Sequence, residues 1–288
     1  MTESRFSRNE LLFGKEGQQQ IEATSVAIVG VGGLGSHVVQ QLAYLGVKTI
    51  TLIDADTVTL SNINRLVGAT EEDIGCPKVD VLERLVKAIR PETEVTKVKE
   101  SFISEPGFSR LKNVGLIFGC VDRDAARLIL TEFSAAYSKP YLDAATDAGK
   151  DGESWGGRIV FMLPGGSCVY CRGELSQEEV RRYLSTPEER EVEDRIYGVS
   201  REALSQTGPS VVSLNGIIAS VAVTEFMVLV TGLRRPKTYL QYRGAFGILT
   251  TPSDPPLEGC HYCKTLYGKG EVAQVERYIR QGVGRYLR

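Results

Sequence analysis

The chain has 288 residues, of which 42% are hydrophobic and 24% are charged, a composition typical of a globular protein with one large α/β domain or two small ones. The net charge of −2 provides no overall basic field, which argues against nucleic-acid binding. Six cysteines in a chain of this length do not indicate a secreted disulfide scaffold, and the polar first residues do not look like a signal peptide, so we expect a cytoplasmic protein.

Residues 1–22 precede the first predicted strand. They carry Arg5 and Arg8, followed by a helical run that ends near Ile21. Taken alone, this pattern predicts an amphipathic N-terminal arm in contact with solvent.

A strand, a glycine-rich turn and a helix come next. The apolar, β-branched run that begins at Val26 predicts a buried strand, and an apolar helical pattern begins after the turn. The turn has the spacing Gly-x-Gly-x-x-Gly and contributes Gly30, Gly32, Gly33 and Gly35. Glycines let the backbone approach a phosphate closely, and a helix N-terminus offers free N–H groups, so this unit predicts a nucleotide site.

Charged residues further along the chain extend this site. A second strand, 49–53, is followed by Asp54, at the distance where a ribose-binding acid is expected. Arg65 ends a polar loop, Lys78 begins a helix, and Asp122 follows another apolar strand, all at the same carboxyl edge of the sheet. Two cations and two acids exceed what the pyrophosphate of NAD requires. They suit ATP with Mg²⁺, because Lys and Arg neutralise phosphate charge and Asp122 offers a carboxylate ligand.

Strands alternating with helices continue to about residue 145 and predict a Rossmann-like, mostly parallel sheet. The pattern then changes to an extended segment over 158–163 and a hairpin over 239–250, which predict antiparallel strands added to the sheet. Between them, residues 172–209 are highly charged and are predicted to form an exposed excursion.

The longest apolar stretch, 211–230, is long enough to cross a membrane. It contains Asn215 and Glu225, which favour a buried helix in a protein core, and we expect this helix to be broken near Gly216. We therefore expect no membrane partner.

Two Cys-x-x-Cys pairs, Cys168 with Cys171 and Cys260 with Cys263, have the spacing of a tetrahedral Cys₄ zinc site. Each pair follows turn-forming residues, as in a zinc knuckle. Sulfur fills all four positions, so the predicted site is closed and structural rather than catalytic. A redox dithiol is the alternative interpretation.

Together these motifs resemble those of the ubiquitin-activating E1 superfamily in its compact bacterial form, the MoeB, ThiF and HesA-like proteins. The resemblance covers roughly residues 5–263 and implies the E1/ThiF adenylation fold. It rests on Arg5-Phe-Ser-Arg8, Gly30-Val-Gly-Gly-Leu-Gly-Ser36, Asp54-Ala-Asp56, Leu60-Ser-Asn62-Ile-Asn-Arg65, Gly75-Cys-Pro-Lys78-Val, Cys120-Val-Asp122 and the two cysteine pairs.

Enzymes of this kind bind ATP and the C-terminal glycine of a ubiquitin-like protein, whose carboxylate attacks the α-phosphate to give an acyl-adenylate and pyrophosphate. The resemblance assigns the nucleotide contacts by motif: the ribose to Asp54 with Asp56 beside it, the phosphates to Asn62, Arg65 and Lys78, and Mg²⁺ to Asp122. It also implies that Arg8 reaches into the active site of a partner subunit, so that the protein is a homodimer.

The resemblance divides the chain into an N-terminal arm, 1–22, an adenylation domain, 23–263, and a C-terminal extension, 264–288. The domain contains the crossover loop, 172–209, and the extension contains a predicted helical run over 272–279. From exposure alone, we expect the loop and the extension to contact partner proteins.

The crossover loop lacks the cysteine to which many relatives pass the acyl group. Counting back without a gap from Glu225 to Gly232, a segment that resembles a family motif, puts Ser205 at that position. Either Ser205 is an exposed hydroxyl in an enzyme that only adenylates, or it replaces the cysteine and carries an oxyester. Serine is a weak nucleophile without a base, but an acyl-adenylate is already activated.

The predicted function is therefore adenylation of a ubiquitin-like protein, followed by transfer to Ser205 or to an E2-like partner. The alternative is adenylation of a sulfur-carrier protein, of the MoeB or ThiF type, without a covalent intermediate. An NAD(P) oxidoreductase would leave Arg65, Lys78 and the cysteines unexplained, and a non-catalytic E1-like subunit would lack the charged residues that are present. A tRNA-modifying dehydratase that adenylates a small carboxylate is disfavoured by the absence of a strongly basic composition.

Overall fold

The computed structural model describes residues 4–148, 154–185, 210–252 and 257–283. Within these residues, eight strands form one sheet in the order β3-β2-β1-β4-β5-β6-β7-β8. The strands are β1 (Ser25–Val29), β2 (Thr49–Ile53), β3 (Glu94–Val98), β4 (Leu116–Gly119), β5 (Tyr141–Ala148), β6 (Trp155–Met162), β7 (Tyr239–Arg243) and β8 (Ile248–Thr250). The neighbours among β3, β2, β1, β4 and β5 pair in parallel. Strand β6 pairs antiparallel with β5, and β7 and β8 continue the sheet in antiparallel pairs. The predicted Rossmann-like sheet with antiparallel additions is confirmed.

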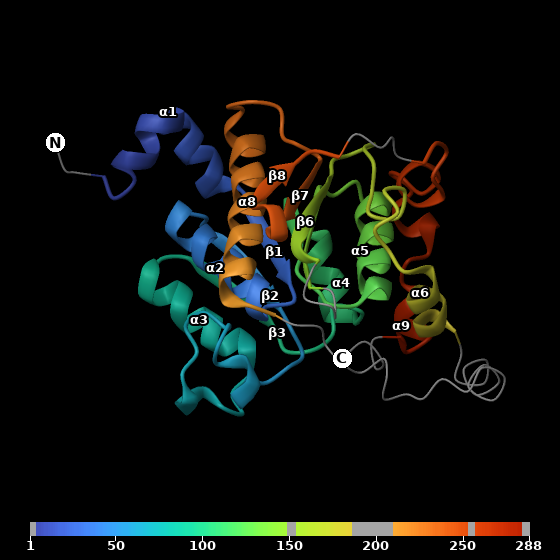
Figure 1. Cartoon of the computed structure of the whole chain (residues 1–288), viewed down its shortest axis with the longest axis horizontal. Helices are drawn as coiled ribbons and strands as arrows, with labels where there is room; N and C mark the ends of the chain where they lie inside the picture. Colours follow the sequence, from blue (N-terminus) through green and yellow to red (C-terminus); the bar gives the residue numbers. More distant parts are fainter. Residues whose placement is uncertain (1–3, 149–153, 186–209, 253–256, 284–288) are drawn as a thin grey trace.

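Helices cover both faces of this sheet (Figure 1). One face carries α1 (Ser7–Ala23), α2 (Gly33–Leu45), α3 (Lys78–Ile89) and α8 (Val212–Thr231). The other carries α4 (Glu105–Lys112), α5 (Asp124–Ala136), α6 (Gln177–Leu184) and α9 (Arg277–Arg280). The four residues after Ser25 in β1 are all apolar because the strand is covered on both faces. Val26 and Ile28 belong to the core under the first set of helices, and Ala27 and Val29 to the core under the second.

Helix α8 is continuous over twenty residues, so the predicted break near Gly216 is wrong. A Cβ at Gly216 would lie 3.5 Å from His37 of α2, an ordinary packing distance, and no kink is needed there. The helix is long and apolar enough to cross a membrane by length and composition, yet half of that window is buried within the protein. It packs along α2 and under the sheet, which is the environment of a core helix (Figure 1).

Two helices lie where the sequence patterns predicted none. Helix α4 begins after Ser104, whose Oγ accepts a hydrogen bond from the Gly107 amide at 3.1 Å. Helix α6 occupies the start of the predicted exposed excursion and packs against α5. The amide of Asp124 donates to Glu179 Oε1 at 3.0 Å and joins these two helices. Only this first part of the excursion is described, and it is docked on the domain.

The C-terminal segment also lies against α5. The hydroxyl of Tyr278 is buried and donates to Glu132 Oε2 at 2.7 Å. The predicted helical run over 272–279 is wrong, because Gln274 adopts the left-handed conformation, with φ of 52°, and separates a 3₁₀ turn (Gly270–Ala273) from α9. Part of the extension that we expected to contact partners is thus packed into the core.

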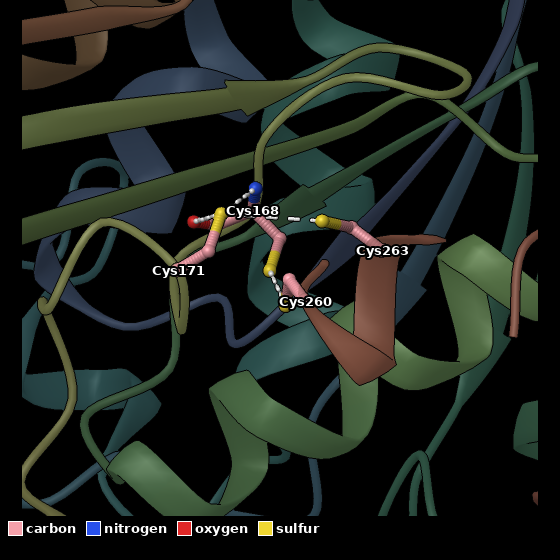
Figure 2. A group of neighbouring side chains, drawn as sticks. All are labelled: Cys168, Cys171, Cys260 and Cys263. Atoms are coloured by element: carbon pink, nitrogen blue, oxygen red, sulfur yellow. Dashed lines mark hydrogen bonds between the residues drawn. The ribbon is translucent and has the colours of Figure 1, made fainter. Parts of the chain in front are cut away.

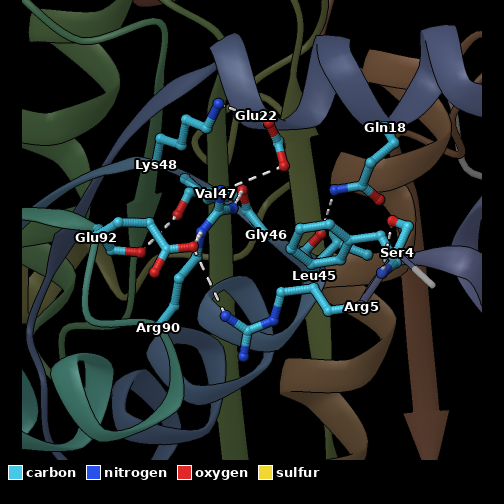
Figure 3. A network of polar contacts seen from close by, with 12 residues as sticks. Ser4, Arg5, Gln18, Glu22, Leu45, Gly46, Val47, Lys48, Arg90 and Glu92 are labelled. Atoms are coloured by element: carbon cyan, nitrogen blue, oxygen red, sulfur yellow. Dashed lines mark hydrogen bonds and ion pairs between the residues drawn. The ribbon is translucent and has the colours of Figure 1, made fainter. Parts of the chain in front are cut away.

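The N-terminal arm is tied to its own domain by a polar network (Figure 3). The side chain of Phe6 is buried, and the Arg90 guanidinium stacks on its ring, 5.1 Å from the centroid. Arg5 Nη2 donates to the Ile89 carbonyl at 2.7 Å. Gly14, with φ of 73° and ψ of 171°, then kinks α1. Arg5 and Phe6 therefore anchor the start of the arm.

Candidate functional site

A cavity of about 510 Å³ opens at the carboxyl ends of the parallel strands. This is the edge at which open α/β sheets bind their ligands. The lining includes nine of the residues predicted from sequence: Gly30, Gly32, Gly33, Asp54, Asp56, Asn62, Arg65, Lys78 and Asp122. The structure therefore brings the separate sequence motifs together around one space.

The glycines of the turn between β1 and α2 are required for different structural reasons. Gly30 has a φ of 83°, and a Cβ there would meet the Cys120 carbonyl oxygen at 2.6 Å. Gly35 does not line the cavity, since a Cβ on it would come within 2.0 Å of the Gly30 carbonyl oxygen. Around Gly32, a Cβ would meet no atom within 4 Å. Gly35 thus permits close packing of helix on strand, and Gly32 leaves space for a ligand.

This difference predicts opposite effects for two alanine substitutions. Gly35→Ala is expected to lower the melting temperature by about 5 °C, because overpacking costs about 1–3 kcal/mol and each kcal/mol shifts a domain of this size by roughly 2–4 °C. Gly32→Ala should leave the melting temperature within about 1 °C of the wild type but weaken ATP binding. Calorimetric unfolding and ATP titration of both variants test this pair, and equal melting temperatures would contradict it.

Asp54 is oriented by the backbone around it. Its Oδ2 accepts the Val31 amide of the glycine turn at 2.8 Å, and its Oδ1 accepts the Asp56 amide at 2.9 Å. Burial raises the pKa of this carboxyl, and the nearby charge of Lys78 acts in the opposite direction. Each oxygen keeps a lone pair that can accept a ribose hydroxyl.

Lys78 is the first residue of α3 and lines the cavity next to Asp56. Its Nζ lies 2.7 Å from Asp56 Oδ2, and its side chain is only 11% exposed. The backbone strengthens this arrangement, since the Lys78 amide donates to the Asp56 carbonyl at 3.0 Å. A cation so shielded from water exerts a strong field on phosphate oxygens that enter the cavity.

Arg65 and Asn62 come from the loop after β2. The stem of Arg65 lies against Gly33, and its Nη1 donates to the Ser61 carbonyl and to Asn64 Oδ1. The Oδ1 of Asn62 accepts the Thr59 amide at 3.2 Å in a short 3₁₀ turn, Leu60–Asn62. Within the described chain, the Nδ2 of Asn62 has no hydrogen-bond partner, so it is free to donate to a phosphate.

Asp122 follows β4 and lies exposed at the mouth of the cavity. Among the described residues, none forms a hydrogen bond or ion pair with its carboxylate. A single unengaged carboxylate next to phosphates is a usual environment for Mg²⁺, which keeps several waters. The donor chemistry therefore fits the predicted metal role.

Besides Gly35, one further described residue of the predicted site is not part of this cavity. Arg8 is exposed on α1, and it does not line the cavity of its own chain. Ser205 lies outside the described residues.

Further polar residues at the cavity, of which Arg127 and Asn215 are buried, were missed from sequence. Arg127, Thr146 and Ser210 line it, and Asn215 of α8 lies behind it. Asn215 accepts a hydrogen bond from Thr146 Oγ1 at 3.2 Å and donates to Ser210 Oγ at 3.1 Å. A polar residue inside the apolar run of α8 was a usable signal for Asn215, whereas Arg127 has the pattern of an ordinary helix-surface residue.

The four paired cysteines meet in one buried cluster, as predicted, and Figure 2 shows their side chains pointing toward one another. The Sγ atoms of Cys168 and Cys260 are 3.8 Å apart, and those of Cys171 and Cys263 are 3.9 Å apart. Sulfurs around tetrahedral zinc, with bonds of about 2.3 Å, are separated by about 3.8 Å. The side chain and the amide of Cys168 lower the pKa of the Cys171 thiol and favour the thiolate that binds metals. The cluster fits Zn²⁺.

Comparisons with known proteins agree with the observed fold. The family model that matches is the ThiF family, over residues 6–261. The tRNA threonylcarbamoyladenosine dehydratase of Bacillus subtilis is 41% identical over 112 residues, which is 39% of this chain and 44% of that protein. The sulfur carrier protein ThiS adenylyltransferase of Escherichia coli is 27% identical over 236 residues, 81% of this chain and 83% of that protein. A crystal structure of Escherichia coli MccB with ATP has the same fold, with a TM-score of 0.70 and 18% identity over 91% of this chain and 75% of that one.

Proposed function

Because the chain belongs to the ThiF family, within the E1-like superfamily, we propose that it adenylates the C-terminal carboxylate of a small carrier protein of the sulfur-carrier or ubiquitin-like class. The observation that carries this proposal is the cavity that gathers the glycine turn, Arg65, Lys78 and Asp122. These groups are suited to a triphosphate whose charge increases during displacement.

In the proposed reaction, a carboxylate oxygen of the carrier attacks the α-phosphorus of ATP. A new P–O bond forms to the acyl group, the bond to the β-phosphate oxygen breaks, and pyrophosphate leaves with the electron pair. Arg65 and Lys78 neutralise the phosphate charge, and Asp54 orients the ribose. Asp122 would hold the Mg²⁺ ion, which supplies further charge neutralisation when bound.

A second cavity, next to the first, supports a binding site for the C-terminal tail of the carrier protein. It has a volume of about 690 Å³, and both cavities are lined by Asp122, Arg127, Ala145, Thr146 and Asp147. Its wall also contains the large side chains of Trp155, Tyr242 and Phe246. Because the two cavities share part of their lining, an extended C-terminal tail in the second cavity would bring its carboxylate next to the nucleotide.

The proposal includes a homodimer in which Arg8 of each chain serves the partner's active site. The anchoring of Arg5 and Phe6 supports it, because this contact holds the arm in place while Arg8 remains exposed. Acyl transfer to Ser205 or to an E2-like partner stays a prediction. A carrier adduct detected by mass spectrometry in the wild type but absent in Ser205→Ala would support the oxyester.

A second candidate substrate is a tRNA, favoured by the 41% identity to a tRNA-modifying dehydratase. The net charge of −2 weighs against it, since tRNA binding usually requires a basic surface.

ATP–pyrophosphate exchange distinguishes these substrates. We expect the purified protein to exchange labelled pyrophosphate into ATP only when a glycine-ended carrier protein is present. The matched control is the same carrier without its terminal glycine, which should give no exchange. Exchange with tRNA but with no carrier protein would replace the proposal by the second candidate.

A further inference from the structure

A buried ionic cluster contributes Arg127 to the wall that the two cavities share and extends from there into the protein. At its centre is Asp143 of β5, whose side chain is 0% exposed. It accepts hydrogen bonds from Arg127 Nη1 at 2.6 Å, from Arg158 Nη1 at 2.5 Å and from the Tyr141 hydroxyl at 2.8 Å. Burial alone would raise the pKa of this carboxyl, but the two guanidinium charges outweigh burial and lower it. Asp143 is therefore the ionised anchor of two arginines.

Arg127 uses its other donors on the backbone at the cavity edge. Its Nη2 donates to the carbonyl of Val121, the residue directly before Asp122. Its Nη1 also donates to the Ala144 carbonyl at 3.2 Å. Val121 follows β4 and Ala144 lies within β5, and both residues line the first cavity. One guanidinium thus sets the spacing between them.

Arg158 fixes the cluster from the other side. Its Nε lies 2.5 Å from Glu174 Oε2, and its Nη2 donates to the Glu174 carbonyl at 3.1 Å. Glu174 follows Cys171 closely in the chain, so the cluster is attached to the cysteine site. With Asp143 held on this side as well, Arg127 has little freedom to change its orientation.

Stability is a poor explanation for such a cluster. Buried ion pairs lose hydration, and apolar residues of the same volume are often equally stabilising. The charged groups instead fix geometry, because a planar guanidinium with several hydrogen-bond donors specifies the positions of its partners.

We propose that Asp143 is a positioning residue for the Mg²⁺–ATP site, acting through Arg127 on the backbone at Val121 and thereby on Asp122. This inference rests on the proposed function. Asp143 lines neither cavity, so its effect passes through Arg127, which lines both cavities and holds the Val121 carbonyl next to Asp122.

The test is the Mg²⁺ dependence of ATP binding in Asp143→Asn, which keeps the shape of the side chain but removes its charge. We expect the Mg²⁺ concentration at half-saturation to rise about tenfold, the lower range for residues that orient a metal ligand. Arg127→Lys keeps the positive charge but loses the several donors of the guanidinium group, so it should raise the half-saturating Mg²⁺ concentration by a similar factor. This variant replaces Asp143→Asn in the test if Asp143→Asn does not fold.

Glu132→Gln is the matched control. Glu132 is also buried and also held by an arginine and a tyrosine, with Arg277 Nη2 at 2.7 Å and the Tyr278 hydroxyl at 2.7 Å. This control should lose stability without any change in the half-saturating Mg²⁺ concentration. An unchanged Mg²⁺ requirement in both Asp143→Asn and Arg127→Lys would overturn the inference.

Measuring ATP binding separates this inference from the proposed function. A wild type that binds Mg²⁺–ATP but exchanges pyrophosphate with no carrier refutes the function, while the Mg²⁺ comparison still decides the role of Asp143. A wild type that does not bind Mg²⁺–ATP refutes both.

Discussion

Replacing Lys78 with alanine is expected to reduce carrier-dependent ATP–pyrophosphate exchange by about 100-fold or more, the range seen when one preorganised charge-stabilising group is removed. The ammonium group is shielded from water inside the cavity, where its field on the phosphates is least screened. The phosphates gain charge during displacement, so the loss should appear in kcat as well as in KM. Exchange kinetics measured over a range of ATP concentrations separate the two constants.

Lys97→Ala is the control for this variant. Lys97 is likewise paired with carboxylates, at 2.7 Å from Asp80 Oδ1 and 2.6 Å from Glu83 Oε2, but it lies outside the cavity. Its removal should change exchange by less than about twofold, since partly exposed ion pairs contribute at most about 1 kcal/mol to stability. Equal exchange rates in Lys78→Ala and Lys97→Ala would contradict the role assigned to Lys78.

Replacing Cys171 with serine is expected to abolish zinc binding and to lower the melting temperature by about 10 °C or more. A structural zinc site contributes several kcal/mol of folding free energy, and each kcal/mol shifts a domain of this size by roughly 2–4 °C. The loss of zinc should also destabilise α5 and the C-terminal segment, because the four cysteines belong to the same buried hydrophobic cluster as these elements. Metal analysis of the purified protein and calorimetric unfolding measure both quantities.

Cys76→Ser controls for the loss of a thiol, because Cys76 is exposed and lies apart from the cluster. It should keep the bound zinc and leave the melting temperature unchanged. Removing zinc from the wild type with a chelator should reproduce the effect of Cys171→Ser. A protein that contains no zinc, and whose cysteine pairs form disulfides on mild oxidation, would instead support the redox dithiol.

Local patterns predicted much of the fold. The run from Val26 and the glycines after it form β1 and the start of α2 as expected, and the hairpin over 239–250 forms as β7 and β8. Two local predictions failed: the left-handed Gln274 interrupts the C-terminal helical run, and α8 continues through Gly216 without a break. Gly216 packs near His37 of α2, a neighbour that a local sequence window does not contain.

The sequence by itself determined the elements whose information is local: the glycine turn, the spacing of the cysteine pairs, and the charged residues that follow parallel strands. Parallel strands share one carboxyl edge, so Asp54, Lys78 and Asp122 had to meet there. Only the tertiary structure decided which polar residues outside the apolar run of α8 are buried. Asp143 and Arg127 become the centre of an ionic cluster because β5, β6 and α5 exclude water around them, and that exclusion arises from packing between segments distant in sequence.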